Sequence, residues 1–346
     1  MIRVGINGLG RIGRNCFRHI QDDPNIQIVH INDPNLSLKN LCYLLKYDSI
    51  YGRNKSVITV EDNTLLLENK KISTSFLNKS HEVNWQKYNI DVLIESSGVV
   101  SVQNDSAKLA RDRIVKKTII THTFKNADKT VILGVNDINL KKDEDHVISS
   151  SICDSTAVAP IFQAIKNVCK INSGSVITLH PWLQYQNLMD GPCRSFAHPH
   201  QNIENFSLGR ASTEALIPKT TSCIDAVIEV HPDLRDKIYG MSFRVPTPSV
   251  SCAIINVLIE NEISHLALQE EFKKINEDFK MNLISINDEE LISRDFIKED
   301  CSAIIDDRWT LIENKNLRIV AWYDNEHGYC SRVIDIVKKV VEPNDK

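Results

Sequence analysis

A glycine-rich turn near the N-terminus, Gly8-Leu-Gly10-Arg-Ile-Gly13, constrains the fold of this chain more than any other part of the sequence. It directly follows the apolar run of residues 2–7 and opens a segment with helical spacing that extends to residue 22. A second strand-like run, residues 26–31, comes next. Strand, glycine turn, helix and strand in this order predict a βαβ unit that binds a dinucleotide, because the glycines let a pyrophosphate approach the helix N-terminus closely.

An acidic residue closes the second predicted strand. Asp33 lies twenty residues after Gly13, where a carboxylate can accept hydrogen bonds from the adenosine ribose. The same charge repels a 2′-phosphate, so we predict NAD as the cofactor in preference to NADP. Two simpler interpretations stay open from these residues alone: a glycine-rich turn without a ligand, and Asp33 as a turn former before Pro34.

The composition is that of a soluble globular protein with two domains. The 346 residues are 42% apolar and 25% charged, and the net charge of −4 comes without a basic stripe, which disfavours nucleic acid as a ligand. The sequence has no apolar run of the roughly 18 residues that a membrane-spanning helix needs, and no cleavable leader precedes the first strand. We therefore expect a cytoplasmic protein that does not contact a membrane.

The nine cysteines do not indicate a disulfide framework or a metal site, because their number is odd and no short paired spacing suits zinc. Eight are expected to be small buried apolar residues or unreactive thiols. Cys153 differs, since it lies between a predicted strand end and a helix start, where the helix dipole and a nearby imidazolium acidify a thiol. His180 ends the next predicted strand and can serve Cys153 as base and later as acid. A packed cysteine and a hydrogen-bonded histidine remain the alternative.

Strand-like runs alternate with helical or loop segments over the first 150 residues, which predicts an α/β fold with an N-terminal Rossmann domain at residues 1–152. The later runs of this part cover residues 57–67, 92–96, 118–121, 130–135 and 147–150.

Residues 153–328 are predicted to form a second, α+β domain with a mixed or antiparallel sheet, and we assign the catalytic residues to it. A helix is expected over residues 156–172 and another over 266–278. Residues 184–212 have little periodicity and predict a long loop. A terminal helix over residues 329–346 is expected to pack back on the first domain. The predicted strands of this domain cover residues 176–180, 238–245, 251–259 and 317–323.

Ten motifs, in the same order along the chain, resemble those of the glyceraldehyde-3-phosphate dehydrogenase family, and they span nearly the whole sequence. They are Gly5-Ile-Asn-Gly-Leu-Gly-Arg-Ile-Gly-Arg14, Ile31-Asn-Asp-Pro34, Tyr47-Asp-Ser-Ile-Tyr-Gly52, Glu95-Ser-Ser-Gly-Val99, Gly134-Val-Asn136, Cys153 with Ala159-Pro160, His180, Asp190-Gly-Pro192, Gly240-Met-Ser-Phe-Arg-Val-Pro-Thr-Pro248 and Trp322-Tyr-Asp-Asn-Glu-His-Gly-Tyr329.

The resemblance implies a mechanism and a set of site residues. In such an enzyme the Cys153 thiolate adds to an aldehyde, His180 assists proton removal, hydride passes to NAD, and inorganic phosphate releases the thioester. The resemblance also implies a homotetramer. Arg244 matches the arginine that binds the substrate phosphate and Thr221 a threonine of the inorganic-phosphate site; without the resemblance, they would be interpreted as a surface charge and a helix cap. The implied dinucleotide-binding residues are Asn7, Gly8, Gly10, Arg11, Ile12, Gly13 and Asp33, with Ser97 and Thr121 along the cofactor and Asn325 on the nicotinamide carboxamide.

Most departures from the family pattern lie near the residues that the resemblance assigns to the reaction and to phosphate binding. Ile152-Cys153-Asp154-Ser155-Thr156 stands where the family usually has Ser-Cys-Thr-Thr-Asn, Leu183 replaces a threonine, and Ser222 follows Thr221 in place of a glycine. The loop over residues 193–208 is longer than usual, and His327 replaces a tryptophan. Lost hydroxyl donors weaken an anion site, and the Asp154 carboxylate opposes phosphate and raises the pKa of Cys153.

We therefore hypothesise that the substrate is not simply glyceraldehyde 3-phosphate, and that water or another acceptor releases the thioester. The alternative, in which backbone amides and Arg244 suffice for the usual reaction, stays open. A second class is a relative that binds NAD but has lost the reaction; the retained Cys153, His180 and Asn325 favour an enzyme. A semialdehyde dehydrogenase is a third possibility, but Asp324-Asn-Glu-His-Gly328 and the segment 243–247 favour the phosphate-sugar branch.

Overall fold

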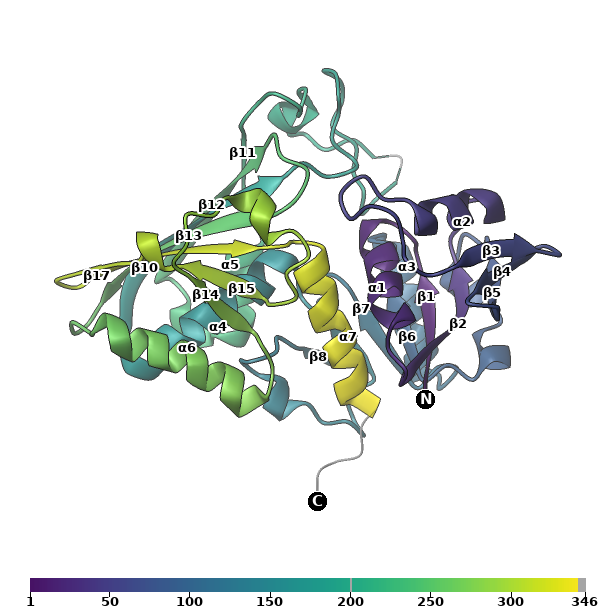
Figure 1. The fold of residues 1–346 in the computed structure, drawn as a ribbon, viewed down its shortest axis with the longest axis horizontal. Helices are drawn as coiled ribbons and strands as arrows, with labels where there is room; N and C mark the ends of the chain where they lie inside the picture. Colours follow the sequence, from purple (N-terminus) through teal and green to yellow (C-terminus); the bar gives the residue numbers. More distant parts are fainter. Residues whose placement is uncertain (200, 342–346) are drawn as a thin grey trace.

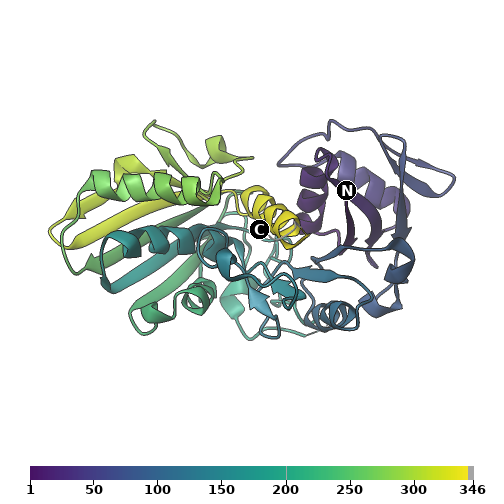
Figure 2. The same ribbon diagram turned by 90° about the horizontal axis from the view of Figure 1, so that it is seen from below.

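The computed structural model describes residues 1–199 and 201–341, which form two lobes on either side of helix α7 (His327–Val341). Figure 1 shows the N-terminal lobe in purple and blue on one side and the second sheet on the other, and Figure 2 shows the same division from below. No helix among the described residues is long and apolar enough to cross a membrane.

The N-terminal lobe is built on a largely parallel sheet with the strand order β3-β4-β5-β2-β1-β6-β7-β9-β8. Strand β1 (Ile2–Asn7) lies near its centre and is parallel to both neighbours, which explains its almost continuous run of buried residues. Three helices accompany the sheet: α1 (Arg11–Gln21), α2 (Leu38–Lys46) and α3 (Val100–Arg111). The other strands are β2 (Ile26–Asn32), β3 (Ile58–Glu61), β4 (Thr64–Leu67), β5 (Lys70–Ser75), β6 (Val92–Glu95), β7 (Lys117–Ile120), β8 (Lys129–Thr130) and β9 (Val147–Ser149).

The second lobe has a mixed sheet with the strand order β11-β12-β10-β13-β17-β15-β14, and β16 additionally pairs with β17. Pairs β10–β12 and β14–β15 are parallel, whereas the remaining pairs are antiparallel. The predicted fold class, a Rossmann domain followed by an α+β part with a mixed sheet, is therefore confirmed. The strands are β10 (Ile171–Pro181), β11 (Ile217–Lys219), β12 (Ile238–Val245), β13 (Ser251–Ile259), β14 (Ile284–Asn287), β15 (Ala303–Asp306), β16 (Leu311–Glu313) and β17 (Asn316–Tyr323).

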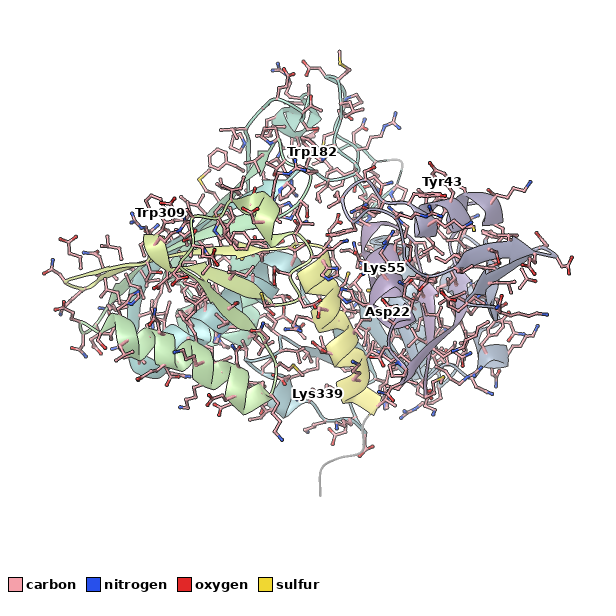
Figure 3. All side chains as sticks on the ribbon, viewed as in Figure 1. Asp22, Tyr43, Lys55, Trp182, Trp309 and Lys339 are labelled. Atoms are coloured by element: carbon pink, nitrogen blue, oxygen red, sulfur yellow. The ribbon has the colours of Figure 1, made fainter. Side chains whose placement is uncertain are left out.

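Three helices of this lobe are α4 (Cys153–Val168), α5 (Cys223–Val230) and α6 (His265–Phe279). Residues 184–199 and 201–212 form the predicted long loop, seen in teal at the top of Figure 1. Figure 3 labels Trp182, which lies where the chain leaves β10 for this loop. Short 3-10 helices complete the chain: η1 (Ser80–Glu82), η2 (Trp85–Tyr88), η3 (Asp137–Asn139), η4 (Phe206–Gly209), η5 (Pro232–Leu234), η6 (Ser293–Phe296) and η7 (Asp307–Trp309).

Several predicted boundaries are wrong, and the strand predicted over residues 176–180 covers Ile171–Pro181. The run 57–67 is a hairpin, because Asp62 and Asn63 turn the chain with φ angles of 46° and 58°. The run 130–135 holds only the end of β8 and then turns, with the Asn136 side chain bonded to Thr130 O and Ile132 N. The helix predicted over 156–172 begins at Cys153 and ends at Val168.

Helix α7 joins the lobes, since it packs against α1 and its buried residues belong to the same apolar cluster as those of α1 and α4. Lys339, labelled in Figure 3, adds an ion pair of 2.7 Å with Asp137. The helix begins two residues before the predicted start, and residues 342–346 of the prediction lie outside the described residues. The division into domains at residues 152 and 153 stays a prediction.

Candidate active site

Cys153 is the first residue of α4, directly after a tight junction with strand β9. Ser151 in this junction has a φ of 59°, a left-handed conformation that costs a non-glycine residue energy. The Tyr329 hydroxyl donates to Ser151 O at 3.1 Å, and Ser155 Oγ accepts the Ile152 N–H at 3.3 Å. These bonds hold the strained turn that presents the Cys153 side chain at the start of the helix.

His180 lies one residue before the end of β10 and faces this thiol. Its Nδ1 lies 2.8 Å from Pro181 O, and because a carbonyl can only accept, Nδ1 carries the ring proton. The unprotonated Nε2 of the neutral ring is 3.6 Å from Cys153 Sγ. Burial, followed by the charge of Arg244, lowers the pKa of His180 to about 4. The imidazole is therefore a neutral base at pH 7, aimed at the thiol.

Asp154 competes with His180 for the proton of the thiol. Its Oδ1 lies 3.5 Å from Cys153 Sγ and 3.9 Å from His180 Nε2, and it accepts a hydrogen bond of 2.8 Å from the Tyr323 hydroxyl. Burial, and then the negative charge of Asp154, raise the pKa of Cys153 well above its ordinary value. The expectation of an acidified thiol is thus wrong for this protein, whereas Asp154 acts in the expected direction.

Arg244 is buried on β12, directly opposite His180 in the parallel register of the two strands. The interpretation of Arg244 as a surface charge is therefore wrong. Its Nε donates to no atom among the described residues. Lys219, at the end of the neighbouring strand β11, is half-buried, and burial followed by the charge of Arg244 lowers its pKa. Two cations beside Cys153 and Asp154, one with an unused donor, make this a place for an anionic group.

Thr221 and Leu183, two further predicted substrate residues, form their hydrogen bonds with residues other than Cys153. Thr221 Oγ1 accepts the Cys223 N–H at 3.1 Å at the start of α5, but the N-cap of this helix is Ser222, so Thr221 is not the cap itself. The Leu183 N–H donates to Gln186 Oε1 at 2.9 Å. Among the described residues, no hydrogen bond or ion pair links either residue to Cys153, so the structure brings together only Cys153, Asp154 and His180, with Arg244 alongside.

The glycine turn has the backbone geometry of a pyrophosphate cradle. Gly8 has a φ of +91°, and a Cβ there would lie 2.5 Å from Ser97 N. A Cβ on Gly13 would lie 2.0 Å from Gly8 O, so the turn and the helix close tightly on each other. A Cβ on Gly10, by contrast, would meet no protein atom within 4 Å. The loop is therefore tight on its protein side and open where the predicted cofactor passes.

Two buried carboxylates organise the residues around this cradle. Asp33 Oδ2 accepts the Leu9 N–H at 2.6 Å, which ties the end of β2 to the glycine turn. Glu95 accepts hydrogen bonds from Asn7 Nδ2 at 2.6 Å and from Ser97 Oγ at 2.5 Å. Thr121 Oγ1 donates to the Glu95 carbonyl at 3.1 Å. The structure thus brings the predicted cofactor residues Asn7, Ser97 and Thr121 around one residue at the end of β6.

Arg11 and Asn325 connect this half of the site to α7. The Arg11 guanidinium pairs with Asp48 and with Glu326, each at 2.5 Å, and Ile12 O accepts from Cys330 Sγ at 3.5 Å. Asn325 is buried, and its Oδ1 accepts no hydrogen bond from the described residues. A buried amide oxygen without a donor fits the carboxamide of a nicotinamide, which the resemblance assigns to this residue.

Comparison with known proteins agrees with this geometry over the whole chain. Residues 2–103 match the family model described as the glyceraldehyde 3-phosphate dehydrogenase NAD binding domain, and residues 152–325 match the corresponding C-terminal domain. The chain belongs to the glyceraldehyde-3-phosphate dehydrogenase family. Glyceraldehyde-3-phosphate dehydrogenase from Geobacillus stearothermophilus is 34% identical over 336 residues, which cover 97% of each chain. Glyceraldehyde-3-phosphate dehydrogenase 2 from Bacillus subtilis is 32% identical over 340 residues, 98% of this chain and 96% of the relative.

Membership of the glyceraldehyde-3-phosphate dehydrogenase family confirms that the chain is an NAD-dependent dehydrogenase. NAD as the cofactor is confirmed with it, and the interpretation as an inactive binding protein is not favoured. The predicted site residues, individually, stay predictions.

Three residues that matter to this geometry were missed as site residues from the sequence. Glu95 lies in the motif Glu95-Ser-Ser-Gly-Val99, but its hydrogen bonds with the side chains of Asn7 and Ser97 are visible only in the structure. Tyr323 contacts Asp154 from a strand 169 residues away, and Lys219 follows a short edge strand. The position of Tyr323 two residues before Asn325 was the available signal; Lys219 had none.

Within residues 1–199 and 201–341, two groups of side chains are close enough to hold a metal ion, and both include histidine. One is Cys153, Asp154 and His180, and the other is His19, Asp300 and His327, whose donor atoms in each group lie within 4.8 Å of one another. The sequence predicted no metal site: the histidines of both groups lie far along the chain from the other group members, and only Cys153 and Asp154 are adjacent.

Proposed function

We propose that the protein oxidises a short aldehyde carrying an anionic group, of the glyceraldehyde 3-phosphate kind, through Cys153. The observation that carries this proposal is the pair Cys153 Sγ and His180 Nε2 at 3.6 Å, with the opposite ring nitrogen held by Pro181 O. In this tautomer the nitrogen of His180 that faces the thiol is the basic one, and the other ring nitrogen carries the proton.

The chemistry follows from that pair. The thiol adds across the aldehyde: a C–S bond forms, and the proton reaches the carbonyl oxygen by way of His180. His180 then removes the proton of the resulting thiohemiacetal hydroxyl as hydride leaves the same carbon. NAD, when bound, supplies the hydride acceptor. Gly8, Gly10, Gly13 and Asp33 would hold its dinucleotide part, and Asn325 would fix its carboxamide. A thioester on Cys153 remains, and an acyl acceptor restores the thiol.

The anionic group of the substrate is assigned to Arg244, with Lys219 adding a second positive charge. The support is the buried, unused Nε of Arg244. Thr221 is retained as a proposed hydroxyl donor, since its oxygen accepts one bond and its proton remains available. Asp154 and Leu183 are proposed to line the reacting end, where they limit anion binding by charge and by an apolar surface.

The test compares NADH formation from glyceraldehyde 3-phosphate and from uncharged glyceraldehyde at pH 8. We expect Arg244→Ala to raise the KM for the phosphorylated aldehyde about 10- to 100-fold, from the loss of a charge-assisted bond. The KM for glyceraldehyde should change little, and exposed Arg235→Ala serves as the control. Equal effects on both aldehydes, or no turnover of the phosphorylated one, would contradict the proposal.

A second candidate concerns the acceptor: water, rather than inorganic phosphate, releases the thioester. Asp154 favours it, because a carboxylate 3.5 Å from Sγ repels a phosphate dianion but can accept a hydrogen bond from water. Turnover at saturating aldehyde should then be the same with and without phosphate, and the product should be a carboxylate. Strong phosphate dependence with an acyl phosphate product would exclude this candidate.

We also propose a homotetramer located in the cytoplasm, as the family resemblance implies. Large apolar side chains are exposed on the second sheet and on the long loop, with Tyr239 65%, Leu188 72% and Phe206 87% exposed. Exposed apolar surface of this kind supports burial between subunits. In this loop Ala197 O accepts the Val100 N–H at 3.1 Å, near the predicted cofactor residue Ser97. Light scattering after gel filtration tests the subunit number.

A further inference from the structure

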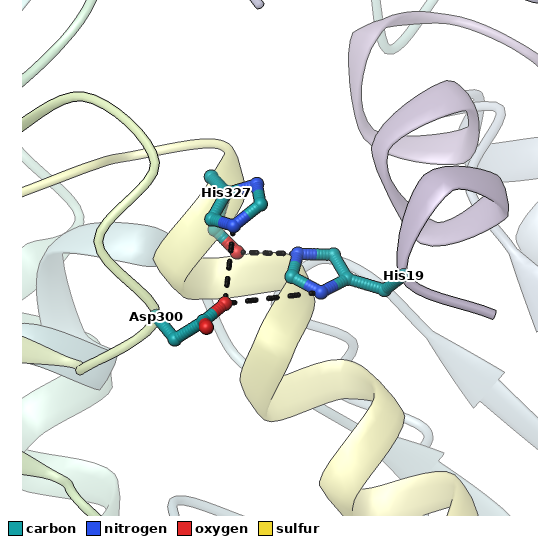
Figure 4. Close-up of side chains that lie close together, drawn as sticks. All are labelled: His19, Asp300 and His327. Atoms are coloured by element: carbon teal, nitrogen blue, oxygen red, sulfur yellow. Dashed lines mark hydrogen bonds and ion pairs between the residues drawn. The ribbon is translucent and has the colours of Figure 1, made fainter. Parts of the chain in front are cut away.

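Three side chains from separate parts of the chain meet where α1 contacts α7, away from Cys153. His19 lies near the end of α1, Asp300 lies between η6 and β15, and His327 is the first residue of α7. Figure 4 shows both rings turned toward the Asp300 carboxylate. His327 Nε2 is 3.0 Å and His19 Nδ1 is 4.0 Å from the same oxygen, Asp300 Oδ1.

The backbone fixes which nitrogen of His19 is available. Its Nε2 lies 3.1 Å from His327 O, and because a carbonyl only accepts, Nε2 carries the proton of the neutral ring. Nδ1 then holds a lone pair directed toward the carboxylate. Two acceptors that face each other repel, unless a cation or a proton lies between them. Histidine ligands in metal sites have this same arrangement, with the second nitrogen donating to a backbone carbonyl.

The spacing and chemistry of the three donors fit a small transition-metal ion. Ligands at the usual zinc distances of about 2.0 to 2.1 Å stand roughly 3.3 Å apart in a tetrahedron, so the 3.0 and 4.0 Å separations need only small side-chain rotations. Two imidazoles with one carboxylate suit zinc and its neighbours better than magnesium or calcium. His327 needs only to move its proton from Nε2 to Nδ1.

The surroundings allow an ion to enter. The Asp300 side chain is 68% exposed, whereas those of His19 and His327 are only 13% and 20% exposed, so the site has two fixed ligands and one open side. The nearby positive charge, Arg332, is engaged by Asp335 at 2.7 Å and by Asn282 O at 3.2 Å. An ion would therefore meet a negative carboxylate and two lone pairs.

We propose that His19, Asp300 and His327 bind one divalent first-row transition-metal ion, with zinc as the best fit and water completing the coordination. The ion would connect α1 to α7 directly beside Glu326, which holds Arg11, and two residues from Asn325. The site lies outside the catalytic group and does not depend on the proposed reaction.

The test uses the full chain, treated with chelator and carrying Cys153→Ser, which removes the thiol of the other metal-capable group. Calorimetric titration with Zn²⁺ should give one equivalent per chain. His19→Ala and His327→Trp should each weaken that binding at least tenfold. The matched control is His265→Ala. In the parent, the His265 ring pairs with Asp307 at 2.9 Å, and among the described residues it belongs to neither metal-capable group. This variant should bind Zn²⁺ like the parent.

Thermal melting supplies a second measurement that a misfolded variant cannot imitate. Without metal, the parent, His19→Ala and His265→Ala should melt cooperatively, and Zn²⁺ should raise the midpoint of the parent and of His265→Ala only. If the parent binds no Zn²⁺, or if a cooperatively folded His19→Ala binds it as tightly as the parent, the proposal is overturned, and the three residues form only a hydrogen-bonded contact between helices.

Discussion

The site has a cofactor half around the glycine turn of residues 8–13 and an acyl half around Cys153. The two halves are held by different kinds of contact. Around the glycine turn the contacts depend on backbone geometry and on two buried carboxyl groups, those of Asp33 and Glu95. Around Cys153 the contacts depend on side chains, and there Asp154 and Leu183 depart from the family. One added methyl group on a glycine can therefore abolish cofactor binding in the cofactor half. In the acyl half, substitutions can change the hydrogen-bond donors of the site one at a time.

The same contrast appears in the charges. Asp33 and Glu95 are satisfied by donors from their own lobe, so their charges serve the fold as much as a ligand. Arg244 Nε has no partner among the described residues, and the Cys153 proton is shared between two acceptors. An unused donor of a buried cation therefore lies close to the reactive thiol in the acyl half, where the reaction and its specificity are set.

The largest effect is expected from removing the nucleophile. Cys153→Ser should lower turnover by about 10³-fold or more, because a hydroxyl of much higher pKa replaces the thiol that faces His180. NAD affinity, measured by quenching of protein fluorescence, should stay within twofold of the parent. A loss of NAD affinity would mean that the two halves are not separable; surviving turnover would remove Cys153 from the mechanism.

A pair of glycine variants tests the cofactor half. Gly13→Ala places a Cβ 2.0 Å from Gly8 O and should lower the free energy of unfolding by about 1 to 3 kcal/mol, with loss of NAD binding. Gly10→Ala is the matched change, because its Cβ meets no protein atom. It should unfold at the same urea concentration as the parent, yet bind NAD more weakly. If Gly10→Ala binds NAD normally, the pyrophosphate does not pass this position.

The sequence predicted the cofactor half well, because a glycine pattern between a strand and a helix states the backbone geometry directly. It also predicted that His180 can serve Cys153, and the structure has the two groups 3.6 Å apart. It could not show that Arg244 is buried, that Tyr323 reaches Asp154, or that His19 meets His327. These contacts join residues 150 or more positions apart or depend on side-chain burial, and local periodicity carries no information about them.

The misplaced boundaries have local physical causes. The polar residues 61–64 interrupt the apolar run, and Asp62 and Asn63 take left-handed conformations there, so the one long run is a hairpin. The thiol of Cys153 was expected to be acidified by the helix start, but burial and the Asp154 charge act in the opposite direction and prevail. The raised pKa of Cys153 leads to the last prediction, which has the smallest expected effect and concerns one charge of the acyl half.

Asp154→Asn should make Cys153 more reactive toward iodoacetamide near pH 8. The raised pKa keeps the thiol protonated at neutral pH, and the thiolate fraction increases as the pH rises toward that pKa. Removing the charge of Asp154 lowers the pKa, so the whole rate–pH curve should move to lower pH, with a rate gain of up to about tenfold at pH 8. Subtracting the labelling of Cys153→Ser isolates this thiol, and exposed Asp225→Asn is the control. An unmoved curve would assign the raised pKa to burial alone, and the carboxylate would then have to act on the acyl acceptor instead of on the nucleophile.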